Sequence, residues 1–219
     1  MRRSLARLEL LILAMLVSFA GVLSAELRVR TVRGDCRIDG EPARAGVPVQ
    51  DGLIAVSRGG EIVLASEEMA IAIVGNALVT IQTGGAYNRL RVLNGLVEFA
   101  GTIDRWQVTA APFTLAVRGE AFAVGRSQAG ALALTIGRGE AALRDHRPSG
   151  LPARTLSARN GATWRADAMA GGLTTFSYFE PSAEELQRFT DLALVVDHVI
   201  VWSPWERGVE ERALTSGER

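Results

Sequence analysis

The side chains that most often supply nucleophiles, general bases or metal ligands are scarce in this chain. Its 219 residues include two histidines, His146 and His198, and a single cysteine, Cys36. A zinc site built from histidine and cysteine is therefore not expected, and Cys36 fits a small, half-buried side chain in an alternating strand. The sequence contains no G-x-S-x-G elbow, no Walker loop, no G-x-G-x-x-G after a strand and no calcium loop. We therefore expect no catalytic residue, no cofactor and no bound metal ion.

The charged residues are balanced, which excludes one class of partner and leaves one class of enzyme open. The 24 basic and 24 acidic residues cancel to a net charge of zero, so no basic field favours nucleic acid as a partner. The acids could still include the facing carboxylate pair that glycoside hydrolysis uses. A carbohydrate-active or other periplasmic hydrolase on a β-solenoid is accordingly the alternative to a non-enzymatic protein, and it requires carboxylates that converge in a groove.

The first 25 residues have the form of a secretory signal. Arginines at positions 2, 3 and 7 precede an apolar run over residues 10–23, and the small residues Ser24 and Ala25 follow. A bilayer core is spanned by about 20 helical residues, and residues 8–25 supply 18 if Glu9 is tolerated. The segment is therefore a cleaved Sec-type signal peptide or an uncleaved anchor, which would be the only contact with the membrane. In either case we expect the chain beyond residue 26 to be exported, free in the periplasm or anchored at the inner membrane.

Short apolar runs between residues 27 and 164 indicate an all-β domain. Runs rich in β-branched residues alternate with breaks at Gly, Asn or Asp roughly every 8 to 12 residues. A short β-solenoid, a sandwich or a barrel would satisfy this spacing. Asn94-Gly95, between apolar runs at residues 90–93 and 96–99, predicts a tight hairpin turn. Gly75-Asn76 predicts another break between two strands.

Six segments in this region carry a family resemblance. They read VRGDCRIDG at residues 32–40, AGVPVQDG at 45–52, GGEIVL at 59–64, VRGEAFAV at 117–124, TIGRGEAAL at 135–143 and LSARNG at 156–161. In this order they resemble the motifs of a FecR-type periplasmic domain, over roughly residues 29–164. The motif positions are Gly34, Gly46, Gly52, Arg118, Gly119, Phe122, Val124, Gly139 and Gly161. Glu120 stands where the family pattern has Thr, and Arg138 where it has Glu.

The resemblance implies an exported all-β domain, solenoid-like in several members, that serves in envelope signalling. The best-known members receive a signal from an outer-membrane receptor and control a sigma factor through a cytoplasmic anti-sigma region. Only seven residues precede the segment 8–25 here, so we do not expect that cytoplasmic region. The remaining expectation is an extracytoplasmic binding, sensor or scaffold module with an unidentified envelope protein as its partner. The oligomeric state is left open.

The glycines of the 117–124 and 135–143 motifs have a physical explanation that does not depend on the family. Gly119 and Gly139 precede alternating apolar runs, where glycine permits a tight bend or the close approach of two strands. Arg118 and Glu120 flank Gly119, and we expect them to form a solvated ion pair of little energetic value.

The C-terminal region predicts an amphipathic helix. Ser182 and Glu185 form a capping box, and apolar residues then recur at helical spacing through Leu186, Phe189, Ala193, Val196 and Ile200. We expect a helix to about Val196 that packs on the β-domain, with a strand over residues 192–202 as the rival because several of these residues are β-branched. The candidates for contact with a partner are Phe189, Trp202 and Trp205.

The expected organisation therefore has four parts. Residues 1–25 form the signal peptide or anchor, 27–170 the all-β domain, 171–205 a helical extension and 206–219 a frayed polar tail.

Overall fold

The computed structural model describes residues 26–84, 86–147, 154–158, 162–168, 174–202 and 210–213. Its strands are β1 (Arg28–Arg33), β2 (Cys36–Ile38), β3 (Glu41–Pro42), β4 (Asp51–Val56), β5 (Glu61–Ala65), β6 (Met69–Gln82), β7 (Asn88–Ala110), β8 (Phe113–Arg126), β9 (Leu132–Asp145), β10 (Arg154–Ala158), β11 (Ala162–Ala168), β12 (Thr174–Phe179) and β13 (Glu210–Ala213). Within these residues there is one α-helix, α2 (Ala183–Ala193), which continues into a 3-10 turn at Leu194–Val196. The prediction of an all-β domain with a C-terminal helix is confirmed, and the rival strand over residues 192–202 is not formed.

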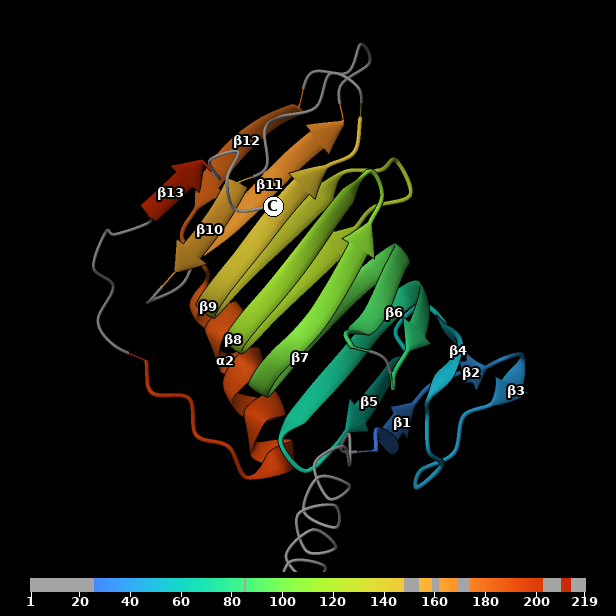
Figure 1. Cartoon of the computed structure of the whole chain (residues 1–219). Coiled ribbons are helices and arrows are strands. Elements are labelled where there is room, and N and C mark those ends of the chain that lie inside the picture. The colour runs from blue at the N-terminus through green and yellow to red at the C-terminus, as the bar shows by residue number, and fades with distance from the viewer. Residues whose placement is uncertain are drawn as a thin grey trace, which may run out of the picture.

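One large sheet contains all the described strands. Its main order is β12-β11-β9-β8-β7-β6-β4-β2-β3 (Figure 1). Off this path β5 pairs with β6 and β1 with β5, while β10 pairs with β9 and β13 with β10. The branches arise because the two halves of a long strand pair with different neighbours: β9 pairs with β11 over residues 132–136 and with β10 over residues 139–143. Every ladder described is antiparallel, and in these ladders the end strands β12 and β3 do not meet. The sheet is therefore open, and its ladders are not the parallel ones of stacked solenoid coils.

The hairpin predicted at Asn94-Gly95 is wrong, as is the break predicted at Gly75-Asn76. Both dipeptides lie inside continuous strands, β7 and β6, and the ladder between these strands shifts register there. Gly95 has φ +99°, and a Cβ at this position would lie 2.6 Å from the Cα of Ala77. The Asn94 side chain donates a hydrogen bond to the carbonyl of Asn76. These residues therefore form a bulge that bends two paired strands without reversing them.

A sharp bend in β7 folds the sheet over its own core. The rings of Phe99 and Trp106 contact edge to face, with centroids 5.6 Å apart. Seven residues of straight strand would separate these positions by about 23 Å, at about 3.3 Å per residue. The chain bends between them at Gly101, which has φ +102°, where the β7–β8 ladder also shifts register. The Trp106 indole N–H lies 3.0 Å from the Met69 sulfur. The result is the sandwich-like alternative: two parts of one sheet enclose the main core.

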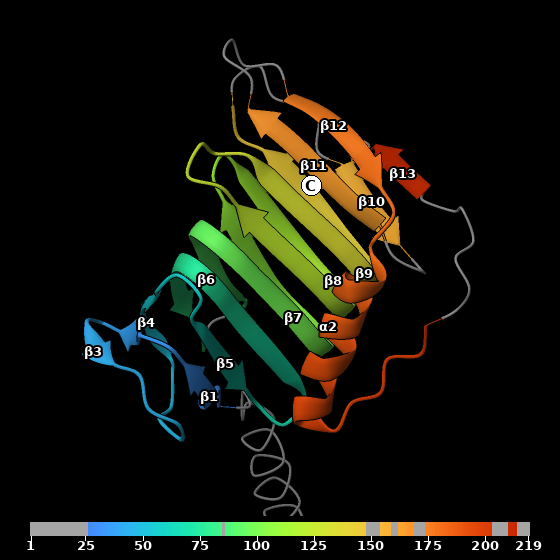
Figure 2. The same cartoon turned by 180° about the vertical axis from the view of Figure 1, so that it is seen from behind.

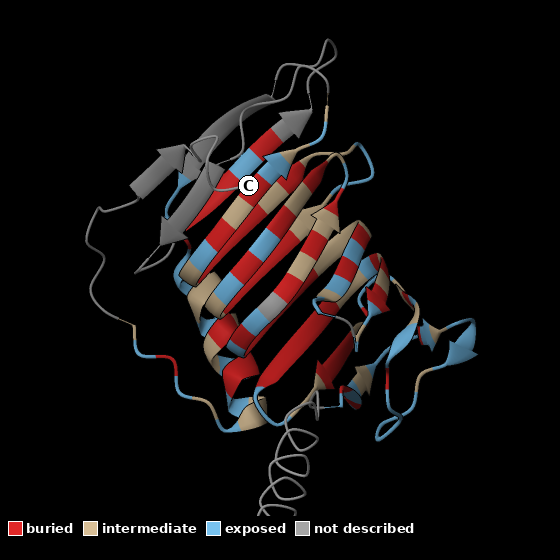
Figure 3. Cartoon of the chain, viewed as in Figure 1, coloured by how far each residue is buried: buried red, intermediate tan, exposed pale blue. Residues whose placement is uncertain are grey.

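Buried residues run through the middle of β6 to β9, whereas β3 at the rim is exposed (Figure 3). On the side of the sheet away from this core, α2 crosses the long strands (Figure 2). Its buried residues join those of β5 to β8 in a second, smaller cluster. Among the described residues no helix is long and apolar enough to cross a membrane. The signal peptide or anchor expected at residues 1–25 lies outside the described residues.

Candidate functional site

The sheet face beneath α2 is built from small residues, which lets the helix lie close. The side chains buried there are those of Ala70, Ala72, Ala100, Ala121 and Ala123. Gly137 belongs to the same surface: a Cβ at this position would lie 3.1 Å from the Phe189 ring and 3.0 Å from that of Trp202. Phe189 itself is 1% exposed. The predicted apolar side of the helix therefore packs on its own domain, as expected.

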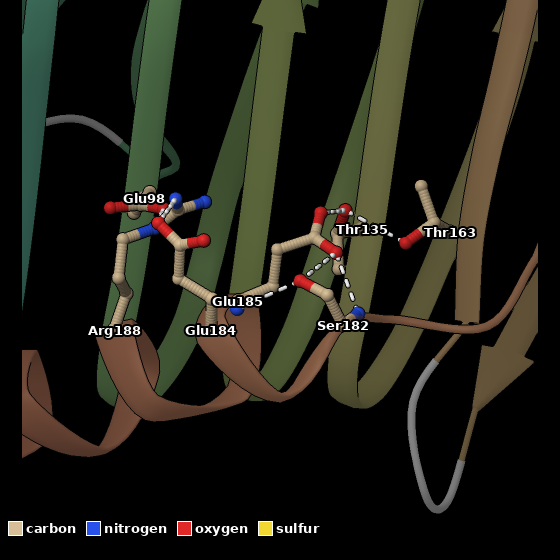
Figure 4. Close-up of polar contacts among 7 residues, drawn as sticks. All are labelled: Glu98, Thr135, Thr163, Ser182, Glu184, Glu185 and Arg188. Atoms are coloured by element: carbon tan, nitrogen blue, oxygen red, sulfur yellow. Dashed lines mark hydrogen bonds and ion pairs between the residues drawn. The ribbon is translucent and has the colours of Figure 1, made fainter.

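The start of α2 is fixed by the capping box that the sequence predicts. The backbone N–H of Glu185 donates to the Ser182 hydroxyl at 3.2 Å, and the Ser182 N–H donates to the Glu185 carboxylate at 2.8 Å. The other oxygen of Glu185 accepts a hydrogen bond from the Thr135 hydroxyl at 3.4 Å, and Thr135 is 3.1 Å from the Thr163 hydroxyl (Figure 4). The cap thus also ties the helix to β9 and β11.

A partly buried ion pair holds the middle of α2 to β7. The Arg188 guanidinium donates to the Glu98 carboxylate at 2.8 Å, and the Glu98 side chain is only 5% exposed (Figure 4). Burial raises the pKa of Glu98, and Arg188 offsets this only in part. Sequence reasoning missed this pair, although Glu98 is an acid within the apolar run of residues 96–99 and so was a detectable signal.

The segment after α2 is held to the sheet while exposing large aliphatic side chains. Asp197, with φ +53°, ends the 3-10 turn, and the chain then continues alongside the helix. Ile200 is buried. The Trp202 indole donates to the Thr190 hydroxyl at 2.9 Å, and Arg138 donates to the Val201 carbonyl at 2.6 Å.

Between and beside these anchors three side chains remain in solvent. Their exposed fractions are 58% for Leu194, 73% for Val199 and 64% for Val201. We call these three residues the exit surface. Sequence reasoning missed it, because the helical spacing assigned to residues 186–200 conceals the alternation of exposed and buried residues from 199 onward.

The predicted ion pair between Arg118 and Glu120 is wrong, because each of these residues pairs across the β8–β9 ladder instead. Arg118 contacts Glu140 at 2.9 Å, and Glu120 contacts Arg138 at 3.5 Å. Residues two apart in a regular strand share a face, but the register shift next to the Gly119–Gly139 pair interrupts this alternation, and each charged residue meets a partner on β9 instead. The imidazole of His198, in the segment after α2, lies 3.7 Å from the Glu120 carboxylate and adds a third group to this cluster. All of these pairs are partly exposed, and each contributes under about 1 kcal/mol.

The motif residues singled out from the sequence are distributed through the fold and do not form one site. Gly34 and Gly46 have positive φ in the N-terminal part, and a Cβ at Gly52 would lie 2.8 Å from an Asp39 carboxylate oxygen. Phe122 and Val124 are core residues. Gly161 and Trp205 lie outside the described residues. These glycines and apolar residues therefore have backbone and packing roles where they are described.

The candidate partner contacts need one correction. The burial of Phe189 beneath the helix removes it from any surface in this structure, and Trp202 is half-buried with its indole N–H bonded to Thr190. The surface next to them is formed by the exit surface residues instead.

The side chains that could act as nucleophiles, general bases or metal ligands lie on different elements. Cys36 is buried, its thiol lies 3.3 Å from the Arg33 carbonyl, and burial raises its pKa, which disfavours the thiolate. His146 is exposed and bonds the Thr114 hydroxyl at 2.9 Å. Within the described residues no group of three or more His, Cys, Asp or Glu side chains could hold a metal ion. Near α2, Glu98 is bonded to Arg188 and Glu185 to the helix cap, so these two carboxylates have structural partners.

No family model, curated protein or solved structure matches this chain. The resemblance to FecR-type domains rests on the sequence motifs alone.

Proposed function

We propose that this chain is a non-catalytic binding module outside the cytoplasm, and that its exit surface contacts an envelope protein. The observation that carries the proposal is the exposure of Leu194, Val199 and Val201 on a segment that is otherwise anchored. Isolated exposed apolar residues are common on proteins, but several on one fixed stretch are typical of an interaction site.

The anchoring contacts make this surface suitable for recognition. Ile200 and Trp202 pack inward, and Arg138 holds the Val201 carbonyl, so the exposed valines alternate with anchored positions. A surface that is already ordered loses little conformational entropy on binding. Asp191 and Asp197 are exposed on the same helix and its end. The complementary partner is therefore a protein with an apolar patch and a basic rim.

The location is supported by the N-terminal residues and by the resemblance to FecR-type domains. A basic start followed by an apolar run is the form of an export signal. A reporter that is active only outside the cytoplasm, fused after residue 30, should be active. An intact but silent fusion would contradict the location without bearing on the binding surface.

Site-specific photo-crosslinking in exporting cells tests the binding surface. A photoreactive amino acid at Val199 should give a discrete crosslinked product, and the product should disappear when Leu194→Asp is added. The matched control is the same amino acid at Arg58, an exposed loop residue between β4 and β5. The proposal fails if Arg58 gives the same product, or if Val199 gives none in cells where the protein is exported and folded.

A further inference from the structure

The described sheet ends in four strands that each have only one ladder partner. These strands are β1, β3, β12 and β13. An end strand presents unpaired backbone N–H and C=O groups, which can pair with another chain unless the strand is protected. The four edges can therefore be compared for the features that prevent strand addition.

Three of the edges carry such features. In β1 the residues include Arg28, Arg30 and Arg33, and its ladder shifts register after Val29. In β3 there are only two residues, one of them a proline. Strand β13 has four residues, of which two are glutamates and one is an arginine. Charges, proline, irregular register and short length all disfavour the pairing of a strand with another chain.

Strand β12 has none of these features. Its six residues read TTFSYF, without a charge, a proline or a glycine. Its ladder to β11 runs through six consecutive pairs without a shift of register. It lies at the outer margin of the sheet in both views (Figures 1 and 2). At its end Phe179 is 43% exposed, with the Arg165 guanidinium 4.7 Å from its ring centroid.

We propose that β12 pairs in antiparallel fashion with β12 of a second copy of this chain, so that one sheet continues through a twofold axis. An antiparallel pair of identical strands is self-complementary, so the contact closes as a dimer. No like charges oppose it, whereas self-pairing of β1 would bring arginines together. Uncharged β-branched and aromatic residues are also those that pair best across strands.

The symmetry requires the twofold axis to pass through a residue, and the two central residues of β12 give the longest overlap. A twofold axis perpendicular to the sheet keeps each residue on its own face, so each position must oppose one of the same parity. Centred on Phe176, the pairing sets Thr174 against Tyr178 and Thr175 against Ser177. Centred on Ser177, it sets Thr175 against Phe179 and Phe176 against Tyr178. Both choices place aromatic residues opposite threonine or another aromatic residue, and such pairs are favourable.

A pair of lysines tests either register. In Thr175→Lys/Ser177→Lys, lysines oppose one another directly whether the axis passes through position 176 or 177. Within one copy these positions lie opposite Asp167 and Arg165 of β11, and Arg165 is exposed. The matched control is Thr31→Lys/Gln82→Lys, which adds the same charge at two exposed positions of β1 and β6.

Sedimentation equilibrium of the full exported protein over a concentration series gives the readout. The wild type and the control should approach twice the monomer mass, while Thr175→Lys/Ser177→Lys should stay monomeric with an unchanged far-ultraviolet spectrum. A monomeric wild type overturns the proposal, and so does a lysine variant that still dimerises.

If the lysine variant is misfolded, cysteine crosslinking tests the pairing instead. Ser177→Cys alone tests the register centred on Ser177, and an equal mixture of Thr175→Cys and Ser177→Cys tests the register centred on Phe176. One of them should give a disulfide-linked dimer on mild oxidation, and the absence of both products overturns the proposal. The crosslink from Val199 does not depend on this pairing, so the two tests fail separately.

Discussion

The close approach of Gly119 and Gly139 allows the loss of stability on substitution to be divided into two parts. Gly119 has φ +145°, and a Cβ at this position would lie 2.5 Å from the Cα of Gly139, as well as in contact with the Arg138 carbonyl. Both obstacles are backbone atoms, so no side-chain rotation relieves them. For Gly119→Ala the unfavourable backbone conformation costs about 1–3 kcal/mol, and the forced displacement of the neighbouring strand about 1–3 kcal/mol more. We expect a total loss of about 2–6 kcal/mol in the free energy of unfolding.

Gly130 supplies the matched control for this substitution. It also has positive φ, +87°, but a Cβ there would meet nothing within 4 Å. For Gly130→Ala the free energy of unfolding should therefore fall only by the cost of the backbone conformation, about 1–2 kcal/mol. Urea denaturation of the two variants measures the difference. If Gly119→Ala lowers the free energy of unfolding by no more than Gly130→Ala does, then the approach of β8 to β9 does not require glycine, and the reasoning is refuted.

Two further predictions concern the attachment of α2. Because burial raises the folded-state pKa of Glu98 above its ordinary value of 4.5, its contribution to stability is full below pH 4.5 and declines as pH rises through the folded-state pKa. Glu98→Gln has no carboxyl group to titrate at this position. Urea denaturation should therefore show the wild type gaining stability relative to Glu98→Gln as the pH falls from neutral towards 4.5. A difference that does not change with pH would contradict the raised pKa of Glu98. Phe189→Ala should lose about 3–5 kcal/mol, since it empties a buried site. Leu194→Ala, at an exposed position, should change stability by less than about 0.5 kcal/mol while weakening the crosslink from Val199, and equal melting of the two variants would refute this distinction.

Local signals in the sequence were sufficient for the strands of the β-domain and for α2, but not for β12 and β13, which lie in the segments expected to be a helical extension and a frayed tail. Apolar runs with β-branched residues identified the strands, and Ser182 with Glu185 identified the helix start, because a capping box acts within four residues. Glycine breaks were misread because the same residue supports a hairpin turn and a bulge. At Asn94-Gly95 the choice between them depends on Ala77 in the neighbouring strand, and that contact is not visible in the local pattern.

The candidate site was less predictable than the fold because it depends on contacts between distant residues. The apolar spacing of α2 predicted which side of the helix is buried, but not that alanines of three strands, β6, β7 and β8, receive it. The exposure of Val199 and Val201 depends on two anchors of the same segment. Arg138, in β9, holds the Val201 carbonyl, and Thr190, in α2, holds the Trp202 indole. No short-range rule links residues so far apart in the chain. Glu98 is the exception, since an acid within an apolar run signals a buried partner.

The glycine pair and the exit surface belong to one mechanical unit. Glu120 and Arg138 flank the Gly119–Gly139 approach, and both also reach the segment after α2: Arg138 through the Val201 carbonyl and Glu120 through His198. A shift of β8 against β9 therefore moves the groups that position Val201, while the capping box and the Glu98–Arg188 pair continue to hold the start and middle of the helix. A substitution at Gly119 or Gly139 that leaves the protein folded should therefore displace the exit surface while α2 stays attached to the sheet. The binding surface is thus set by the backbone geometry of β8 and β9 as much as by its own residues.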